Sequence, residues 1–194
     1  MSELFRTFIG IRPPEDIRER IAVAQMSLRR RAGSEVARWT PPHELFLSLC
    51  ALGELNAGTL FRVGPTVEQV FANHPPLKLE MLGFGGSPNS TQPRIAWIGV
   101  GGDTASLEAL HADIERAIVP LGLQREITKL ACHVPIGKLK YESESGRSDL
   151  GRALRMTQVE PLGAWLASDV ELMKSDVGPS GPTVVTLASF ALRG

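Results

Sequence analysis

Two short apolar runs carry the side chains that organise this sequence. The run at residues 131–140, ACHVPIGKLK, contains His133, and a weaker echo of its layout lies at 45–53, LFLSLCALG. Imidazole titrates near neutral pH, so His133 can take up or release a proton during a reaction. Both runs have the composition of β-strands and are bounded by helical segments. This layout predicts two similar lobes that face one cleft.

The first run separates into two faces. Alternate residues of a strand point the same way, and Leu45, Leu47 and Leu49 therefore form an apolar face that is expected to be core. The opposite face carries the side chains available to a ligand, which are Phe46, Ser48 and Cys50.

The remaining pattern alternates strands and helices. Apolar alternation predicts strands, and apolar residues at helical spacing predict helices. Gly53 is expected to end the second strand, and the polar stretch 141–149 is expected to be a mobile loop. The predicted strands cover 4–11, 45–51, 77–82, 94–100 and 131–139 with a final hairpin of 165–173 and 183–192, and the main helices cover 15–31, 60–71 and 104–121.

Many of these strands are half polar and are joined by short turns, which favours an α+β fold with antiparallel sheets over a doubly wound parallel sheet. No low-complexity linker divides the chain. Residues 1–194 are therefore expected to form a single bilobal domain.

Composition excludes several classes of function. The 21 basic residues equal the 21 acidic ones, so binding to a long nucleic-acid duplex is not expected. No apolar run approaches the roughly 20 residues of a membrane span, and the N-terminus lacks the features of a signal peptide, so the expected location is cytoplasmic. The two cysteines form no disulfide framework or zinc pattern, and no metal or cofactor is expected.

Several segments together resemble the two-histidine (2H) phosphoesterase superfamily, in its branch of RNA 2′,3′-cyclic phosphodiesterases, also called 2′-5′ RNA ligases. The segments occur in the order and spacing of that family over nearly the whole chain. They are RTFIGI, RW followed by PPHELFLSLCALGEL, PRIAWIGV, HVPIGKLK and VELMKSDVGPSGPTVVTLASFAL.

The resemblance implies two lobes related by a pseudo-two-fold, each an antiparallel sheet with helices on its outer face. Each lobe would supply one His-x-Thr motif to a shared cleft. One histidine would act as general base and the other as general acid on a cyclic phosphate, while the hydroxyls hold phosphate oxygens. The implied ligands are RNA ends or small cyclic nucleotides.

This chain departs from the family pattern at three of the four motif positions, and at two of them the imidazole or hydroxyl is lost. Phe46 and Ser48 stand at the first His and Thr positions, and His133 and Pro135 stand at the second pair. A missing general acid or base costs about 10²–10⁴ in rate. Cyclic phosphodiesterase activity is therefore expected to be impaired. Lys138 stands where the family commonly has arginine, but strict alternation puts it on the face opposite His133, and only a bulge would bring it to the phosphate.

Each candidate also has a structural interpretation. His133 could be a buried histidine, although its motif position favours the cleft, and it is the predicted catalytic residue. Ser48 could either contact phosphate or fill space. Phe46 could pack over the cleft floor, which is favoured, or form a platform for a base. His43 has the wrong strand parity to replace the missing imidazole, and surface roles suffice for His74 and His111.

Three functions remain. The first is a phosphodiesterase of this family with degraded catalytic groups, which retains His133 for proton transfer and Ser48, Lys138 and Phe46 for substrate. The second is a non-catalytic module that binds nucleotides or RNA ends in the same cleft. The third is a scaffold whose cleft is filled.

Overall fold

The computed structural model describes residues 4–123, 130–178 and 181–194. Its strands form two sheets in which every recorded pairing is antiparallel. The four-stranded sheet has the order β3 (Leu47–Asn56), β1 (Leu4–Ile11), β8 (Asp169–Gly178), β9 (Gly181–Ala191). The five-stranded sheet has the order β2 (Ala37–Trp39), β6 (His133–Leu139), β5 (Ile95–Gly102), β4 (Leu77–Ser87), β7 (Ala164–Ala167).

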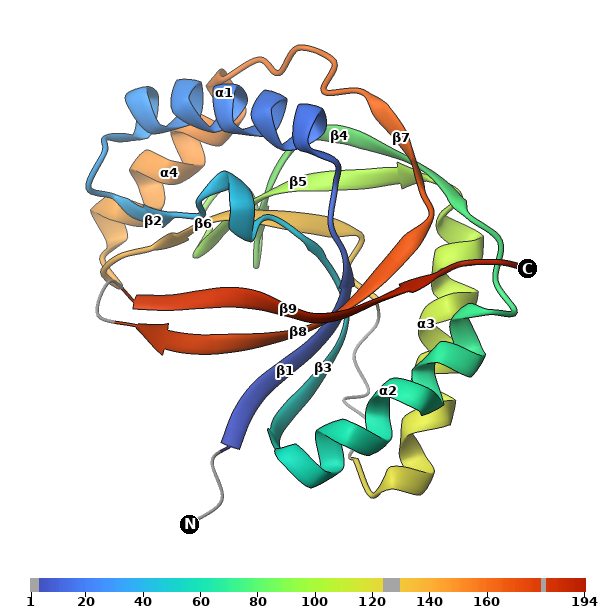
Figure 1. The fold of residues 1–194 in the computed structure, drawn as a ribbon. Helices are drawn as coiled ribbons and strands as arrows, with labels where there is room; N and C mark the ends of the chain where they lie inside the picture. The colour runs from blue at the N-terminus through green and yellow to red at the C-terminus, as the bar shows by residue number, and fades with distance from the viewer. Residues whose placement is uncertain (1–3, 124–129, 179–180) are drawn as a thin grey trace.

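The helices pack in two pairs, one beside each sheet (Figure 1). The pair α1 (Glu15–Ala32) and α4 (Glu144–Met156) lies over the five-stranded sheet, and the pair α2 (Ala57–Phe71) and α3 (Thr104–Ile118) lies beside the four-stranded sheet. Short 3₁₀ helices cover Pro42–Glu44 and Val119–Leu121. The α+β prediction with antiparallel sheets and flanking helices is confirmed. Within the described residues, no helix is both long and apolar enough to cross a membrane.

The leucine face of the first motif strand is confirmed as core. Leu45, Leu47 and Leu49 are each at most 3% exposed. The prediction that Gly53 ends this strand is wrong, because β3 continues to Asn56. The pairing between β1 and β3 shifts register beside Gly53, whose φ of 77° suits the irregular backbone there.

Two further predictions need correction near the C-terminal third. The stretch 141–149 is not all loop, because α4 begins at Glu144, and the Ser143 hydroxyl caps it by accepting a hydrogen bond from the Gly146 N–H at 3.1 Å. The predicted strand 165–173 is two strands. Its first half, β7, pairs with β4, while β8 forms the hairpin with β9 and also pairs with β1.

Candidate active site

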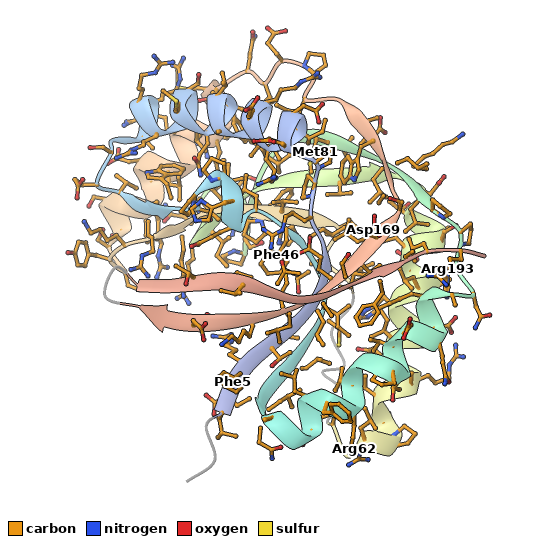
Figure 2. The ribbon with its side chains drawn as sticks, in the orientation of Figure 1. Phe5, Phe46, Arg62, Met81, Asp169 and Arg193 are labelled. Atoms are coloured by element: carbon orange, nitrogen blue, oxygen red, sulfur yellow. The ribbon has the colours of Figure 1, made fainter. Side chains whose placement is uncertain are left out.

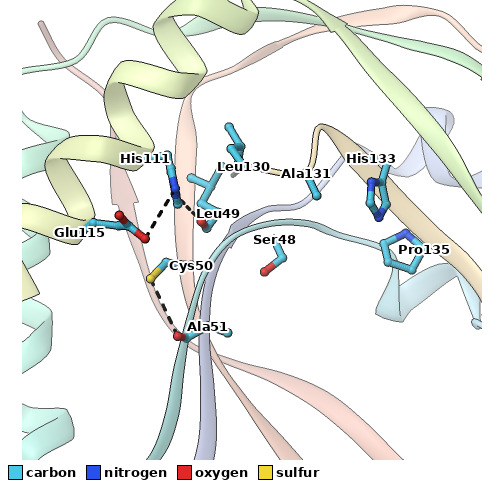
Figure 3. Close-up of a pocket in the computed structure, with 10 residues that line it drawn as sticks. All are labelled: Ser48, Leu49, Cys50, Ala51, His111, Glu115, Leu130, Ala131, His133 and Pro135. Carbon is cyan, nitrogen blue, oxygen red and sulfur yellow. Dashed lines mark hydrogen bonds and ion pairs between the residues drawn. The ribbon is translucent and has the colours of Figure 1, made fainter. Parts of the chain in front are cut away.

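The two motif strands meet at one pocket. It has a volume of about 190 Å³. Figure 3 shows Ser48 on β3 and His133 and Pro135 on β6 among its walls, with His111 and Glu115 of α3 at the other end. The remaining lining residues are Leu49, Cys50, Ala51, Leu130 and Ala131. The structure thus brings the predicted Ser48 and His133 to one cavity.

His133 is the first residue of β6 and pairs with Gly99 of β5. Its ring is half-buried and stacks on the indole of Trp97, with ring centroids 5.0 Å apart and an interplanar angle of 24°. Burial lowers the pKa of the His133 imidazole below its ordinary value of 6.5. The ring is therefore mainly neutral at pH 7, which is the form that accepts a proton.

Trp97 is held in place by its surroundings. Its Nε1–H donates a hydrogen bond to the Ser87 Oγ at 2.9 Å. A side chain at Gly85, its partner on β4, would overlap the six-membered ring, and a Cβ at Gly99 would lie 3.6 Å from the same ring. The glycines thus leave room for the indole to lie across the strands. This arrangement fixes the surface against which the His133 imidazole stacks.

We expect Trp97→Leu to raise the pKa of His133 toward 6.5, because the substitution uncovers one face of the imidazole. It should also lower the free energy of unfolding by about 1 kcal/mol through loss of the ring contact. An NMR titration of the four histidines, with His133→Ala for assignment, measures the pKa. Trp165→Leu on β7 is the matched control and should leave the His133 titration unchanged. An unchanged His133 titration in Trp97→Leu would contradict the role given to the indole.

Phe46 immediately precedes β3, and Ser48 is the second residue of that strand. Ser48 pairs with Gly10 of β1 and is half-buried. The Phe46 ring rests on Gly10, where an added Cβ would be 2.9 Å from its Cδ2, and it contacts the Phe8 ring with centroids 6.0 Å apart. Figure 2 places Phe46 in the middle of the molecule. These contacts are those of a packed side chain, and its role as a base platform stays a prediction.

The bulge that Lys138 requires is present in β6. Trp97 pairs with Pro135 while the adjacent Ala96 pairs with Gly137, so Ile136 is an extra residue on β6. After the bulge, Lys138 pairs with Ile95, which by alternation lies on the same face of β5 as Trp97. Lys138 does not line the His133 pocket. It lines the adjacent hollow together with Pro135.

The curated proteins similar in sequence to this chain include several that are named RNA 2′,3′-cyclic phosphodiesterase. No family model matches it. It is 24% identical to the RNA 2′,3′-cyclic phosphodiesterase of Methanothermobacter thermautotrophicus over 187 residues, which cover 96% of this chain and 98% of that protein.

Two solved structures share the fold. TT0787 of Thermus thermophilus superposes with a TM-score of 0.78 at 22% identity, covering 97% of this chain and 98% of that one. Escherichia coli LigT, in a complex with 3′-AMP, superposes with a TM-score of 0.77 at 18% identity, covering 99% and 100%.

Over nearly its whole length the chain thus resembles RNA 2′,3′-cyclic phosphodiesterases of the two-histidine (2H) phosphoesterase family, in its 2′-5′ RNA ligase-like branch.

The position of His111 in the pocket wall was not predicted from the sequence. The His111 side chain is only 13% exposed. Its Nδ1 lies 2.7 Å from the Leu49 carbonyl oxygen, which can only accept, so Nδ1 carries a proton. Its Nε2 lies 3.6 Å from Oε1 of Glu115. His111 therefore ties α3 to the motif strand β3, and its position followed from helix packing that the sequence pattern did not indicate.

An ion pair at the first motif strand was also missed. The Arg12 Nε donates to the Glu171 Oε2 at 3.1 Å, and both side chains are less than a fifth exposed. Its Nη1 donates to the His43 carbonyl and its Nη2 to the Thr186 Oγ1 at 3.3 Å. Arg12 thus holds the turn before β3 against β8 and β9. The His43 imidazole itself is 71% exposed and does not line the His133 pocket.

Side chains that could bind a metal ion are dispersed over the described part of the chain. Across the described ranges, no three histidine, cysteine, aspartate or glutamate side chains gather as a metal site requires.

Proposed function

We propose that this protein binds RNA or nucleotide ends that carry a 2′,3′-cyclic phosphate and hydrolyses them slowly to a phosphomonoester. The observation that carries the proposal is that His133 and Ser48, one from each motif strand, line a single pocket. The relative named RNA 2′,3′-cyclic phosphodiesterase and the structure of LigT with 3′-AMP support this choice of ligand.

In the proposed reaction, neutral His133 is the general base. It takes a proton from a water molecule as that water attacks the phosphorus atom. One of the two ring P–O bonds breaks, and the ribose oxygen released takes a proton from solvent. The imidazolium then returns its proton to solvent. The Ser48 hydroxyl donates a hydrogen bond to a phosphate oxygen, and Lys138 offers positive charge from the adjacent hollow.

The hydrolysis is proposed to be slow because two groups are missing. Phe46 cannot protonate the leaving oxygen, and Pro135 has no hydroxyl for the phosphate. Each loss costs about 10²-fold or more in comparable enzymes, although losses within one catalytic unit do not simply multiply.

A non-catalytic binding module is the second candidate. The observation that favours it is the Phe46 ring, which packs against Gly10 and Phe8 and replaces a proton-transfer group with an apolar surface. A pocket that keeps His133 and Ser48 would still hold a phosphate under this alternative.

The proposed function is tested by incubating the protein with an oligoribonucleotide that ends in a 2′,3′-cyclic phosphate, and following both binding and monoester formation. The matched control is the same oligonucleotide with a 3′-hydroxyl end. We expect tighter binding of the cyclic end and slow turnover. Binding without turnover would support the module, and equal binding of the two ends without turnover would overturn both proposals.

We expect kcat/KM for the cyclic end to rise with pH through a value below 6.5 and then to level off. The sign follows from the lowered pKa of His133, because a general base must be neutral and protonation below that pKa removes the base. Initial rates between about pH 5 and about pH 8 measure the profile. A rate that falls as pH rises through this range would assign His133 the role of general acid instead.

A further inference from the structure

Two further hollows continue from the His133 pocket along the edge of the five-stranded sheet. The first has a volume of about 470 Å³ and shares Pro135 with the His133 pocket. The second has a volume of about 590 Å³ and shares Arg38, Trp39 and Lys138 with the first. The three spaces thus follow one another from β6 across β2 toward Arg29 of α1. We call the two outer hollows the β2 track.

Two cations face each other in the β2 track. Arg38 of β2 and Lys138 of β6 are direct cross-strand partners, and both are exposed. Among the described residues neither forms an ion pair, whereas Lys140 pairs with Glu35 at 2.7 Å. Like charges directly opposite each other destabilise a pair of strands. An anion between them would remove that repulsion.

The track also holds an aromatic ring. Trp39 lines both hollows and is half-buried. Its ring covers Gly137, where an added Cβ would be 2.8 Å from the Trp39 Cε3, and its Nε1–H donates to the Ser34 carbonyl at 3.3 Å. A positive groove with a fixed aromatic ring is the usual surface for single-stranded nucleic acid, which offers phosphates to cations and bases to rings.

We propose that the β2 track binds the nucleotides that precede the cyclic phosphate in a single-stranded RNA, with their phosphates at Arg38 and Lys138. The inference rests on the proposed function, because it places the cyclic end in the His133 pocket. The local positive charge contrasts with the equal numbers of basic and acidic residues in the whole chain. The β2 track therefore binds only a short segment of single-stranded RNA. Because a cyclic mononucleotide cannot reach the track, RNA ends are the preferred ligand.

The test compares a hexaribonucleotide ending in a 2′,3′-cyclic phosphate with 2′,3′-cyclic AMP, each as competitor of a fluorescent cyclic-ended oligonucleotide. We expect the hexanucleotide to bind at least about tenfold more tightly, since it adds phosphate and stacking contacts. Arg38→Gln should weaken hexanucleotide binding about fivefold more than binding of the mononucleotide, and should reduce the slope of log affinity against log salt by about 0.7.

The matched control is Arg62→Gln. Arg62 is exposed on α2, at the far end of the molecule from β2 (Figures 1 and 2), and its substitution should change neither affinity. Equal affinities for the hexanucleotide and the mononucleotide, or equal effects of Arg38→Gln and Arg62→Gln, would overturn the track while leaving the proposed function. Displacement of the RNA by polyglutamate as readily as by the hexanucleotide would also overturn it. If neither cyclic ligand binds or turns over, the proposed function itself fails.

Discussion

Replacing Phe46 by histidine and Pro135 by threonine is expected to raise the rate of hydrolysis of a 2′,3′-cyclic phosphate by about 10²- to 10⁴-fold. Phe46→His supplies a second imidazole that can protonate the leaving ribose oxygen, and proton transfer by one such group contributes this range of rate. Pro135→Thr adds a hydroxyl that can hold a phosphate oxygen as the charge develops.

The structure can accommodate both substitutions. The Phe46 ring lies over Gly10, and the smaller imidazole fits in the same space. Pro135 is exposed and sits next to the bulge at Ile136, where a change of residue disturbs the regular ladder least. The backbone positions of both motif pairs are therefore available to the restored side chains.

Rates of monoester formation from a cyclic-ended oligonucleotide measure the effect, with thermal unfolding as a check on folding. The matched control is Phe46→Leu with Pro135→Ala, which removes the same two side chains without adding an imidazole or a hydroxyl. It should show no gain. A doubly substituted protein that folds and binds the ligand, but gains no rate, would argue against the phosphodiesterase proposal.

His133→Ala in the doubly substituted protein is expected to lower that restored rate by about 10²- to 10⁴-fold, because the reaction loses its general base. In the unsubstituted protein the same change should remove the slow turnover and weaken binding of the cyclic end, since the ring lines the pocket. His74→Gln is the control. His74 pairs with Asp113 at 2.9 Å and does not line the His133 pocket.

Product formation measures the rate and fluorescence anisotropy measures binding. Together they distinguish a phosphodiesterase from a non-catalytic binding module. Loss of rate with retained binding in His133→Ala assigns the imidazole to catalysis. Loss of binding in a protein that never turns over the ligand supports the binding module. A His133→Ala protein that matches its parent in both measurements would remove His133 from the site altogether.

The sequence predicted those strands in which one face is buried and the other is not. The alternation of Leu45, Leu47 and Leu49 predicted a strand with a buried face, because only that face can be removed from water. The family motifs then indicated that Ser48 and His133 belong to one site, and the structure places both at one pocket.

Other features depended on contacts between distant segments. Alternation alone put Lys138 on the wrong face, because the extra residue Ile136 becomes visible only when β6 is paired with β5. His111 lies on a helix whose pattern gave no sign that its ring would reach the Leu49 carbonyl. The extension of β3 past Gly53 likewise required the register of its partner β1.

The strand order has a consequence for how the molecule can be divided. The chain passes back and forth between the two sheets, and the sheet that holds Ser48 is completed by β8 and β9 from the opposite end of the sequence. No single cut can therefore release one sheet intact, so the halves of the pocket cannot be expressed as separate fragments. Contacts between residues this far apart in the sequence also favour slow folding. Because β8 and β9 are synthesised last, the pocket should be among the last parts of the nascent chain to form.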